Sequence, residues 1–529
     1  MANTPCGRHL PPGPSPSPPT AISEDDCTTL STPPANSGTE ASTAGASCQQ
    51  GDLPEDIIHC IHSLLTVKDA ARAACVCRGF LRSWRCYSNL VLNQHTLGLA
   101  DKTLKEQEAC IIKKVDQILE NHHNNGIKVE TLKLTLILPT YGSIKASVVD
   151  RWLQITVKTG IKELDLSILL QKEEYIFPCA LLSDEAAATS IQSLHLSGCA
   201  FHPTSSIGIL RRLTCLHLSV IRVTEKELGL LLSKSSVLEK LDISFCWGLT
   251  CLRIAWTLHQ LKYLSLIQCI GLQSVQVDAP NLCSFHSDSI GILTEISVRN
   301  SSTQLQNIDL SMILLSDART KLPSIIRNVE SLTLHSPYGE KVNTPIPMLP
   351  SKFPHLKNLE IILHRAAMPI PPSRDIFSLV SFLAASPVLE FFILQIEEGA
   401  SRPDHVSGDD NEYSRRKLEY RHDRLRQVLI TGFYPSNSLV ELMIHILESA
   451  ASLECLTVDT IYFSNRRLGT IGRCPASTKD GQCWAMSKKN VVGAHRAVEV
   501  ASRCIAWRVP KHVQFKVVEP CSRCHSIDQ

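Results

Sequence analysis

Three stretches in the middle of the chain share one pattern of large aliphatic residues: L-T-C-L-H-L-S (213–219), L-E-K-L-D-I-S (238–244) and L-K-Y-L-S-L-I (261–267). The first, fourth and sixth positions are apolar in each, and the end of each stretch alternates as a half-buried strand does. Further copies start at 191, 329, 356 and 453, and weaker copies start at 129, 161, 282, 305, 389 and 425. A pattern that returns so often indicates a repeat protein.

The spacing of the copies indicates the kind of repeat. From 213 to 329 successive starts are separated by 25, 23, 21, 23 and 24 residues. Leucine-rich repeats have this length, and each of their coils adds one short strand to a shared parallel sheet. Cys199, Cys246 and Cys269 each stand three residues after the last strand position, where such repeats place a small inward-facing side chain. The sequence therefore predicts a curved α/β solenoid with a parallel sheet and structural cysteines.

A second series of apolar residues predicts what stands opposite the strands. It begins 11 residues after the starts at 238, 261 and 282 and reads Leu249/Leu252/Ile254, Leu272/Val275/Val277 and Leu293/Ile296/Val298. These coils are expected to have strands on both walls. Elsewhere the runs 224–232, 375–385 and 438–451 predict helices, the first and last beginning at the capping pairs Thr224/Glu227 and Ser438/Glu441.

The N-terminal part differs from the repeats in composition. Residues 1–50 contain nine prolines and 14 Ser or Thr but few large aliphatic residues, which predicts a disordered tail. A dense helical pattern follows from residue 52 to about residue 87. It predicts a helix ending near Leu65, a second starting at the capping pair Thr66/Asp69, and a third carrying Phe80 and Trp84. A bundle of about 35 residues is too small to be stable unaided, so we expect it to need a partner.

This bundle has more apolar residues than it can bury internally, which predicts a docking surface for a partner's helices. The residues expected to form it are Leu53, Pro54, Ile57, Ile58, Leu64, Leu65, Val76, Cys77 and Phe80. The stretch D-L-P-E-D-I-I-H-C-I-H-S-L-L-T-V-K-D-A-A-R-A-A-C-V-C-R-G-F-L-R-S-W (52–84) resembles an F-box, although Thr66 stands where proline is common and Gly79-Phe80 where a basic residue and Trp are common. The resemblance implies docking on a Skp-type adaptor and, through it, on the cullin of an SCF ubiquitin ligase. The alternative is a helical hairpin that only caps the repeats.

A second resemblance concerns the last repeats. H-D-R-L-R-Q-V-L-I-T-G-F (422–433) and L-V-E-L-M-I-H-I-L-E-S-A-A-S-L-E-C-L-T-V (439–458) are similar to the FBD region of a plant, particularly grass-type, family in which leucine-rich repeats follow the F-box. The expected domains are therefore a tail at 1–50, an F-box at 51–90, a leucine-rich-repeat solenoid at 91–400, FBD-like final repeats at 401–464 and a basic C-terminal region at 465–529.

The basic C-terminal region holds 12 Lys or Arg against four Asp or Glu. Apolar residues at helical spacing over 491–505 and alternation over 513–517 predict that it folds as a helix and a strand. Cys521 and Cys524 form a lone C-x-x-C, which lacks the second pair of a four-ligand zinc site. A plain tail is the first interpretation there, and zinc binding or a redox dithiol is the alternative.

Composition narrows the function. The net charge of +2 provides no field that would gather nucleic acid or an anionic membrane, and no run approaches the ~18 apolar residues of a membrane helix. The 21 cysteines without a secretory leader indicate a reducing compartment, so we expect the nucleus, the cytoplasm or both.

Catalytic signatures are missing from the sequence. It contains no P-loop, no Rossmann glycine fingerprint, no G-x-S-x-G elbow and no H-E-x-x-H motif, and His122-His123 is interpreted as a loop. We therefore expect no enzyme activity, no cofactor and no metal.

Together these observations predict the substrate-recognition subunit of an SCF-type E3 ubiquitin ligase. The resemblance implies that the F-box docks the adaptor, that the repeats bind an unknown protein target, and that a RING-bound partner performs the chemistry. Four outward strand residues, His195, His217, Asp242 and Ser265, are expected neighbours on successive coils and the candidate target contacts of the concave sheet. A scaffold that binds a partner without directing ubiquitination is the alternative.

Overall fold

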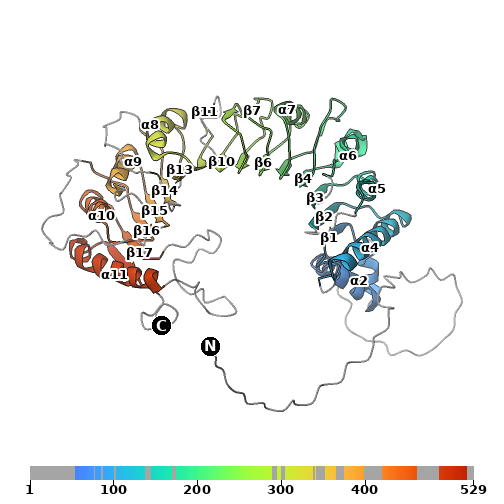
Figure 1. Cartoon of the computed structure of the whole chain (residues 1–529), viewed down its shortest axis with the longest axis horizontal. Coiled ribbons are helices and arrows are strands. Elements are labelled where there is room, and N and C mark those ends of the chain that lie inside the picture. The colour runs from blue at the N-terminus through green and yellow to red at the C-terminus, as the bar shows by residue number, and fades with distance from the viewer. Residues whose placement is uncertain are drawn as a thin grey trace, which may run out of the picture.

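The protein is an arc of stacked coils with strands on its inner face and helices on its outer face, as the computed structural model shows (Figure 1). The structure describes residues 54–76, 78–84, 87–100, 103–137, 144–169, 174–288, 295–298, 304–337, 340, 352–364, 375–397, 420–461 and 488–520. The expected tail at 1–50 and the Cys521/Cys524 pair lie outside these residues. The predicted fold class, a helical bundle followed by a repeat solenoid with a parallel sheet, is confirmed.

The helical bundle has the three expected helices: α1 (Glu55–Ser63), α2 (Val67–Val76) and α3 (Arg78–Trp84). Pro54 occupies the N-cap of α1. The backbone N–H of Asp69 donates to Thr66 Oγ1 at 3.2 Å, and the Thr66 hydroxyl donates to Asp69 Oδ2 at 2.8 Å. The capping pair predicted for the second helix is therefore present.

One parallel sheet of 15 strands runs through the described solenoid in the order β1-β2-β3-β4-β5-β6-β8-β10-β12-β13-β14-β15-β16-β17-β18. Every predicted copy of the pattern supplies one strand. The first strand was not predicted, because only Leu90 and Leu92 alternate in it. The strands are β1 (Asn89–Leu92), β2 (Thr131–Ile137), β3 (Glu163–Leu169), β4 (Ser193–Ser197), β5 (Cys215–Ser219), β6 (Lys240–Ser244), β8 (Tyr263–Ile267), β10 (Ser284–Asp288), β12 (Asn307–Ser311), β13 (Ser331–His335), β14 (Asn358–Leu363), β15 (Phe391–Ile396), β16 (Gln427–Thr431), β17 (Cys455–Asp459) and β18 (Gln514–Val518).

The opposite wall mixes strands and helices, as expected. β7 (Cys251–Ile254), β9 (Ser274–Val277) and β11 (Glu295–Val298) form a three-stranded parallel sheet in the order β11-β9-β7. The remaining described coils have helices at this wall or next to it: α4 (Leu104–Asn124), α5 (Ala146–Val157), η1 (Cys179–Ser183), α6 (Glu185–Ser190), α7 (Glu225–Ser233), α8 (Leu315–Ile325), η3 (Ile376–Leu379), α9 (Val380–Ala385), α10 (Asn437–Ser449), α11 (Lys488–Cys504) and η5 (Ala506–Arg508).

Of the two predicted helix starts, one is confirmed and one is wrong. Thr224 and Glu227 form a reciprocal capping box at the start of α7. The helix α10 begins at Asn437 with Ser436 at its N-cap, two residues before Ser438, the cap that we expected. Ser438 instead accepts a hydrogen bond from the backbone N–H of Ile376 at 3.2 Å. Its hydroxyl therefore ties two coils together.

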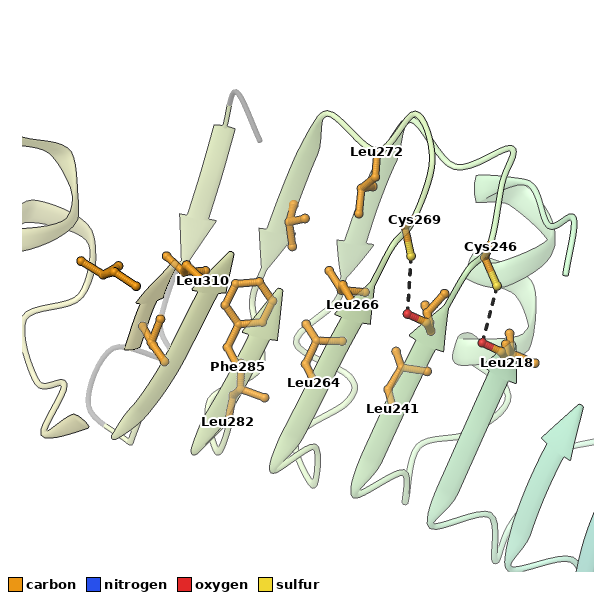
Figure 2. Packing of buried hydrophobic residues seen from close by; sticks show 14 of the residues in the cluster. Leu218, Leu241, Cys246, Leu264, Leu266, Cys269, Leu272, Leu282, Phe285 and Leu310 are labelled. Carbon is orange, nitrogen blue, oxygen red and sulfur yellow. Dashed lines mark hydrogen bonds between the residues drawn. The ribbon is translucent and has the colours of Figure 1, made fainter. Parts of the chain in front are cut away.

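The apolar strand positions and the cysteines form a single core along the solenoid. Leu241, Leu264 and Leu266 are completely buried, and Figure 2 shows them stacked in layers with the same positions of neighbouring coils. The thiols of Cys246 and Cys269 donate to the carbonyls of Leu218 and Ile243 at 3.5 and 3.4 Å. Burial raises the pKa of Cys246 to about 12 and that of Cys269 to about 11, so both thiols stay protonated at neutral pH. These cysteines are structural, as predicted.

The helical bundle shares this core with the first coils. Val67 of α2 belongs to the same buried cluster as Leu90 of β1, and the ring of Trp84 stacks on that of Tyr87 with centroids 5.5 Å apart. His122 was interpreted as part of a loop, which is wrong: it lies in the last turn of α4. Its ring nitrogens are 2.7 Å from the Ile118 carbonyl and 3.0 Å from the Tyr87 carbonyl, so this buried histidine links α4 to the segment that leaves the bundle.

The C-terminal region continues the solenoid. β18 pairs in parallel with β17, and α11 packs at the end of the arc (Figure 1). In the part of the chain that the structure describes, no helix is both long and apolar enough to cross a membrane.

A buried histidine pair predicts that the fold loses stability in acid. The rings of His422 and His445 lie 5.7 Å apart with both residues buried. Burial lowers the pKa of His422 to about 4, with the neighbouring His445 as a further cause, and burial also lowers the pKa of His445. Between pH 6.5 and 4 the unfolded chain then binds more protons than the folded chain, so the free energy of unfolding falls as the pH falls.

For His422 alone we expect a loss of about 3 kcal/mol over this range, since each pKa unit corresponds to about 1.4 kcal/mol. Urea unfolding at pH 7.5, 6, 5 and 4 measures it. His422→Leu is expected to flatten the pH dependence, and the exposed His259→Leu serves as the matched control. A stability that does not decrease between pH 6.5 and 4 would contradict this account.

Candidate functional site

The apolar surface of the helical bundle is narrower than the sequence suggested. Leu64 and Val76 are 81% and 87% exposed, Ile57 is 43% exposed, and Pro54 is exposed beside them. Ile61 is exposed as well and was missed, although it lies one helical turn after Ile57. These side chains are free to contact a partner.

The other residues predicted for this surface support the bundle or cannot be placed. Ile58 is buried, Leu65 packs half-buried against the solenoid core, and Phe80 is half-buried. Leu53 and Cys77 lie outside the described residues. The apolar side chains that this face exposes are therefore Pro54, Ile57, Ile61, Leu64 and Val76, with Ile58, Leu65 and Phe80 behind them.

A buried histidine holds the three helices of the bundle in place. His62 Nδ1 lies 2.7 Å from Ser83 Oγ of α3, and its Nε2 lies 3.0 Å from the Ala70 carbonyl of α2. The His62 ring also meets Phe80 edge-on at 5.5 Å. Burial lowers the pKa of His62 in spite of the Ala70 hydrogen bond. The exposed apolar residues therefore stand on a cross-linked support.

The second candidate surface is the central row of outward side chains on the concave sheet. Strand pairing places His195 beside His217, His217 beside Asp242, and Asp242 beside Ser265. The expected order of these four residues on successive coils is thus present in the structure. Their role in target binding stays a prediction.

Each histidine of this row is held by a carboxylate. His195 Nδ1 lies 3.0 Å from Asp165 Oδ1, and His217 Nδ1 lies 3.3 Å from Asp242 Oδ2. The two imidazole rings meet edge-on with centroids 4.1 Å apart. Burial pushes the pKa of Asp242 upward, but the hydrogen bond and charge of His217 outweigh it, so this pKa lies below its usual value. The carboxylate is therefore ionised at neutral pH.

Ser265 was expected to be accessible to a target, and the structure shows that it is not. It occupies the outward position of β8 but is completely buried. Its side chain is short, and its register neighbours Asp242 and His286 are larger. A target could reach Ser265 only if these neighbours moved.

A second histidine and carboxylate cluster, which the sequence analysis missed, continues the row. Asp309 lies 3.1 Å from His286 Nδ1 and 3.3 Å from His335 Nε2, and His335 Nδ1 lies 3.1 Å from His364 Nε2. His364 in turn pairs with Glu397 at 3.0 Å. The sequence did contain a signal for this cluster, because His286 and Asp309 occupy the central outward position of their strands. Both strands come from weaker copies of the pattern, so the signal was overlooked.

The second cluster is also charged at its centre. Burial pushes the pKa of Asp309 upward, but the hydrogen bonds and charges of His286 and His335 outweigh it and hold this pKa well below its usual value. The two clusters together make the middle of the concave face polar and partly covered, which suits the recognition of a charged partner.

Three side chains of this face stand in the order of a catalytic triad. Ser244 Oγ lies 3.5 Å from His217 Nε2, which gives the order Asp242, His217, Ser244 found in catalytic triads. Ser244 is however buried, so its hydroxyl is not presented to a substrate. Among the described residues, no three His, Cys, Asp or Glu side chains are grouped so that they could hold a metal ion.

Comparisons with known proteins identify both parts of the chain. The family model described as At1g61320/AtMIF1, LRR domain, matches residues 118–522, and the F-box domain model matches residues 51–90. The Arabidopsis thaliana F-box/FBD/LRR-repeat protein At1g13570 is 22% identical over 422 residues, which cover 77% of this chain and 90% of that protein. The predicted F-box and leucine-rich repeats, with a plant relative, are thereby confirmed. The chain belongs to the At1g61320/AtMIF1 leucine-rich-repeat family and carries an F-box in front of its repeats.

Proposed function

We propose that the chain is the substrate-recognition subunit of an SCF-type E3 ubiquitin ligase. The F-box docks a Skp-type adaptor and through it a cullin, and the repeats bind a protein target for ubiquitination. The observation that carries this proposal is an F-box with an exposed apolar surface joined to a solenoid whose concave face is polar and whose described helices lie along the outer side of the arc (Figure 1).

The junction between the two parts supports this role. Because Val67 and Ala70 of the bundle lie in the same core as the first strands, the F-box is held at a fixed place at one end of the arc. F-box proteins with leucine-rich repeats are generally non-catalytic, and the chemistry belongs to the RING-bound partner. A rigid receptor raises the concentration of the target near that partner, which is how positioning accelerates a transfer reaction.

The two departures from the F-box pattern are compatible with docking. Thr66, in place of proline, supplies the cap of α2 through Asp69, and Phe80 packs against the His62 ring. Both substitutions therefore maintain the bundle. The alternative, a scaffold that does not direct ubiquitination, would be favoured by a target whose half-life stays the same when this chain is deleted.

Three finer assignments belong to the same proposal. The region 401–464 is an FBD-like region, the family branch is the grass type, and the protein acts in the nucleus, the cytoplasm or both. Nucleic acid and membranes are not expected partners. Stoichiometric zinc that is lost with Cys521→Ser would instead give the C-terminal cysteines a role.

Replacing exposed residues of the F-box surface tests the adaptor contact. Leu64→Asp with Val76→Asp is expected to weaken adaptor binding at least 100-fold, about 2.7 kcal/mol, because two carboxylates would have to lose water at the interface. Both side chains are exposed, so the fold should tolerate the change. Calorimetric titration with purified adaptor measures the affinity. The control is Ile209→Asp, an apolar residue of the repeats that is 54% exposed. Binding that survives the double replacement would show that the contacts lie elsewhere.

Reversing one charge pair tests the concave face. His217→Glu with Asp242→Lys exchanges the polarity of the pair and leaves two groups that can still attract each other, so folding is expected to be retained. Capture of targets that proximity labelling identifies under proteasome inhibition should fall at least tenfold, while adaptor binding stays unchanged. The comparison variant, Lys488→Glu with Lys489→Glu, alters the exposed basic start of α11. Loss of capture in this comparison variant alone would move the target site to the C-terminal region.

A further inference from the structure

The edge where the concave strands end has an unusual backbone. Directly after β4, β5, β6 and β8, one residue adopts a left-handed conformation: Gly198 at φ +70°, and Val220, Phe245 and Gln268 at φ +52°. The N–H of Val220 donates to the Ser244 carbonyl at 2.9 Å, and that of Phe245 donates to the Ile267 carbonyl at 2.7 Å. The same turn is thus repeated and hydrogen-bonded from coil to coil.

This turn favours glycine, yet only the first of the four coils has a glycine at this position. Side chains on L-residues are strained in the left-handed region, and a β-branched valine there is a rare exception. Val220 and Phe245 are 36% and 52% exposed, so part of each strained side chain is accessible to a partner. Strained residues that persist give a reason to look for a functional role.

The strained residues belong to a cluster of exposed apolar side chains. Two residues farther along each coil, Trp247 forms parallel bridges with Arg222 and with Ile270. Trp247 and Ile270 are exposed, like Phe245. We call the set Val220, Phe245, Trp247 and Ile270 the apolar rim. It spans three successive coils whose strands are about 4.8 Å apart, which makes it a contiguous patch rather than scattered surface residues.

The concave positions beside the apolar rim hold more carboxylates than lysines. On β4 to β10, the strands next to the rim, the outward charged side chains are Asp242, Asp288 and Lys240, and the histidines His195, His217 and His286 lie in the same row. Gln268, in the turn beside Phe245, donates its side-chain amide to Asp288 at 3.2 Å. Negative charge therefore reaches the apolar rim itself, and complementarity favours a cationic partner.

We propose that the apolar rim and the carboxylates of the concave face beside it together bind a target segment in which a large apolar side chain stands next to Lys or Arg residues. The apolar side chain packs between Phe245 and its neighbours, and the cationic side chains lie along the strands toward Asp242 and Asp288. This assignment rests on the proposed function in taking a protein segment as the occupant. The assignment goes beyond the proposed function by specifying the chemistry of the target segment and the surface where that segment binds.

The strain itself provides a well-matched experiment. Val220→Gly with Phe245→Gly removes two rim side chains and places glycine where the backbone favours it, so stability is expected to be retained. Met312→Gly is the control, because it makes the same change at φ +60° directly after β12, outside the apolar rim. Thermal unfolding of all three proteins checks that folding is preserved.

The probes are random twelve-residue peptides displayed on phage and selected on the full chain in complex with its adaptor. We expect selected peptides to combine a large apolar residue with at least one Lys or Arg. Synthetic copies should bind Val220→Gly/Phe245→Gly at least tenfold more weakly than Met312→Gly, and exchange of their basic residues for Glu should abolish binding. Raising the salt concentration should also weaken binding. Selection of peptides without this composition, no selection at all, or equal binding to the two variants would overturn the proposal.

This readout separates the peptide site from the ligase role. Peptide binding by fluorescence anisotropy needs no ubiquitin transfer and can be repeated on the chain without the adaptor. Rim-dependent binding by a chain that does not bind the adaptor would overturn the ligase assignment and leave the apolar rim in place. If adaptor binding and target turnover persist in Val220→Gly/Phe245→Gly, the binding site at the apolar rim would be overturned and the ligase assignment would remain.

Discussion

No coil of this protein can bury its leucines alone, and the rest of the structure follows from that constraint. Each coil offers one short strand whose apolar residues need the same positions of the next coil to exclude water, so the core extends as a single cluster from the F-box to the last strand. Alternation along each strand then sends every second side chain to the concave face. The fold therefore produces an ordered row of polar side chains as a direct consequence of how it is stabilised.

The same constraint makes the F-box an extension of the solenoid. The first strand has no preceding coil, and the apolar residues at that end would be exposed without a cover. Helix α2 provides it, because Val67 and Ala70 enter the core while Trp84, Tyr87 and His122 close the junction. A capping element that also presents exposed apolar residues can hold an adaptor at a fixed distance from the concave face. The buried face of the bundle thus stabilises the fold, and the opposite, exposed face is the one that we propose for adaptor binding.

Periodicity made most of the fold predictable, since leucines at a fixed spacing in successive coils all face the same core. What failed depended on neighbours that no local pattern reveals. Ser265 is buried because Asp242 and His286 flank it, His122 is helical because α4 extends to meet Tyr87, and α10 starts before Ser438 because that hydroxyl is taken by the adjacent coil. The second histidine cluster escaped notice for a related reason: His286 and His335 stand 49 positions apart in the sequence, yet both contact Asp309.

The apolar rim shows how a repeat protein acquires exposed apolar surface when residues at one repeated position depart from the repeat. In a solenoid every coil could end its strand with the same glycine, and Gly198 shows that the turn accepts one. Val220 and Phe245 keep the turn, its hydrogen bonds to the next coil and the register of the sheet, but they add exposed apolar area at a cost in backbone strain. Such a cost is tolerable where the stacked coils fix the backbone on both sides. A binding site can then arise by substitution at a repeated position, with the scaffold left unchanged.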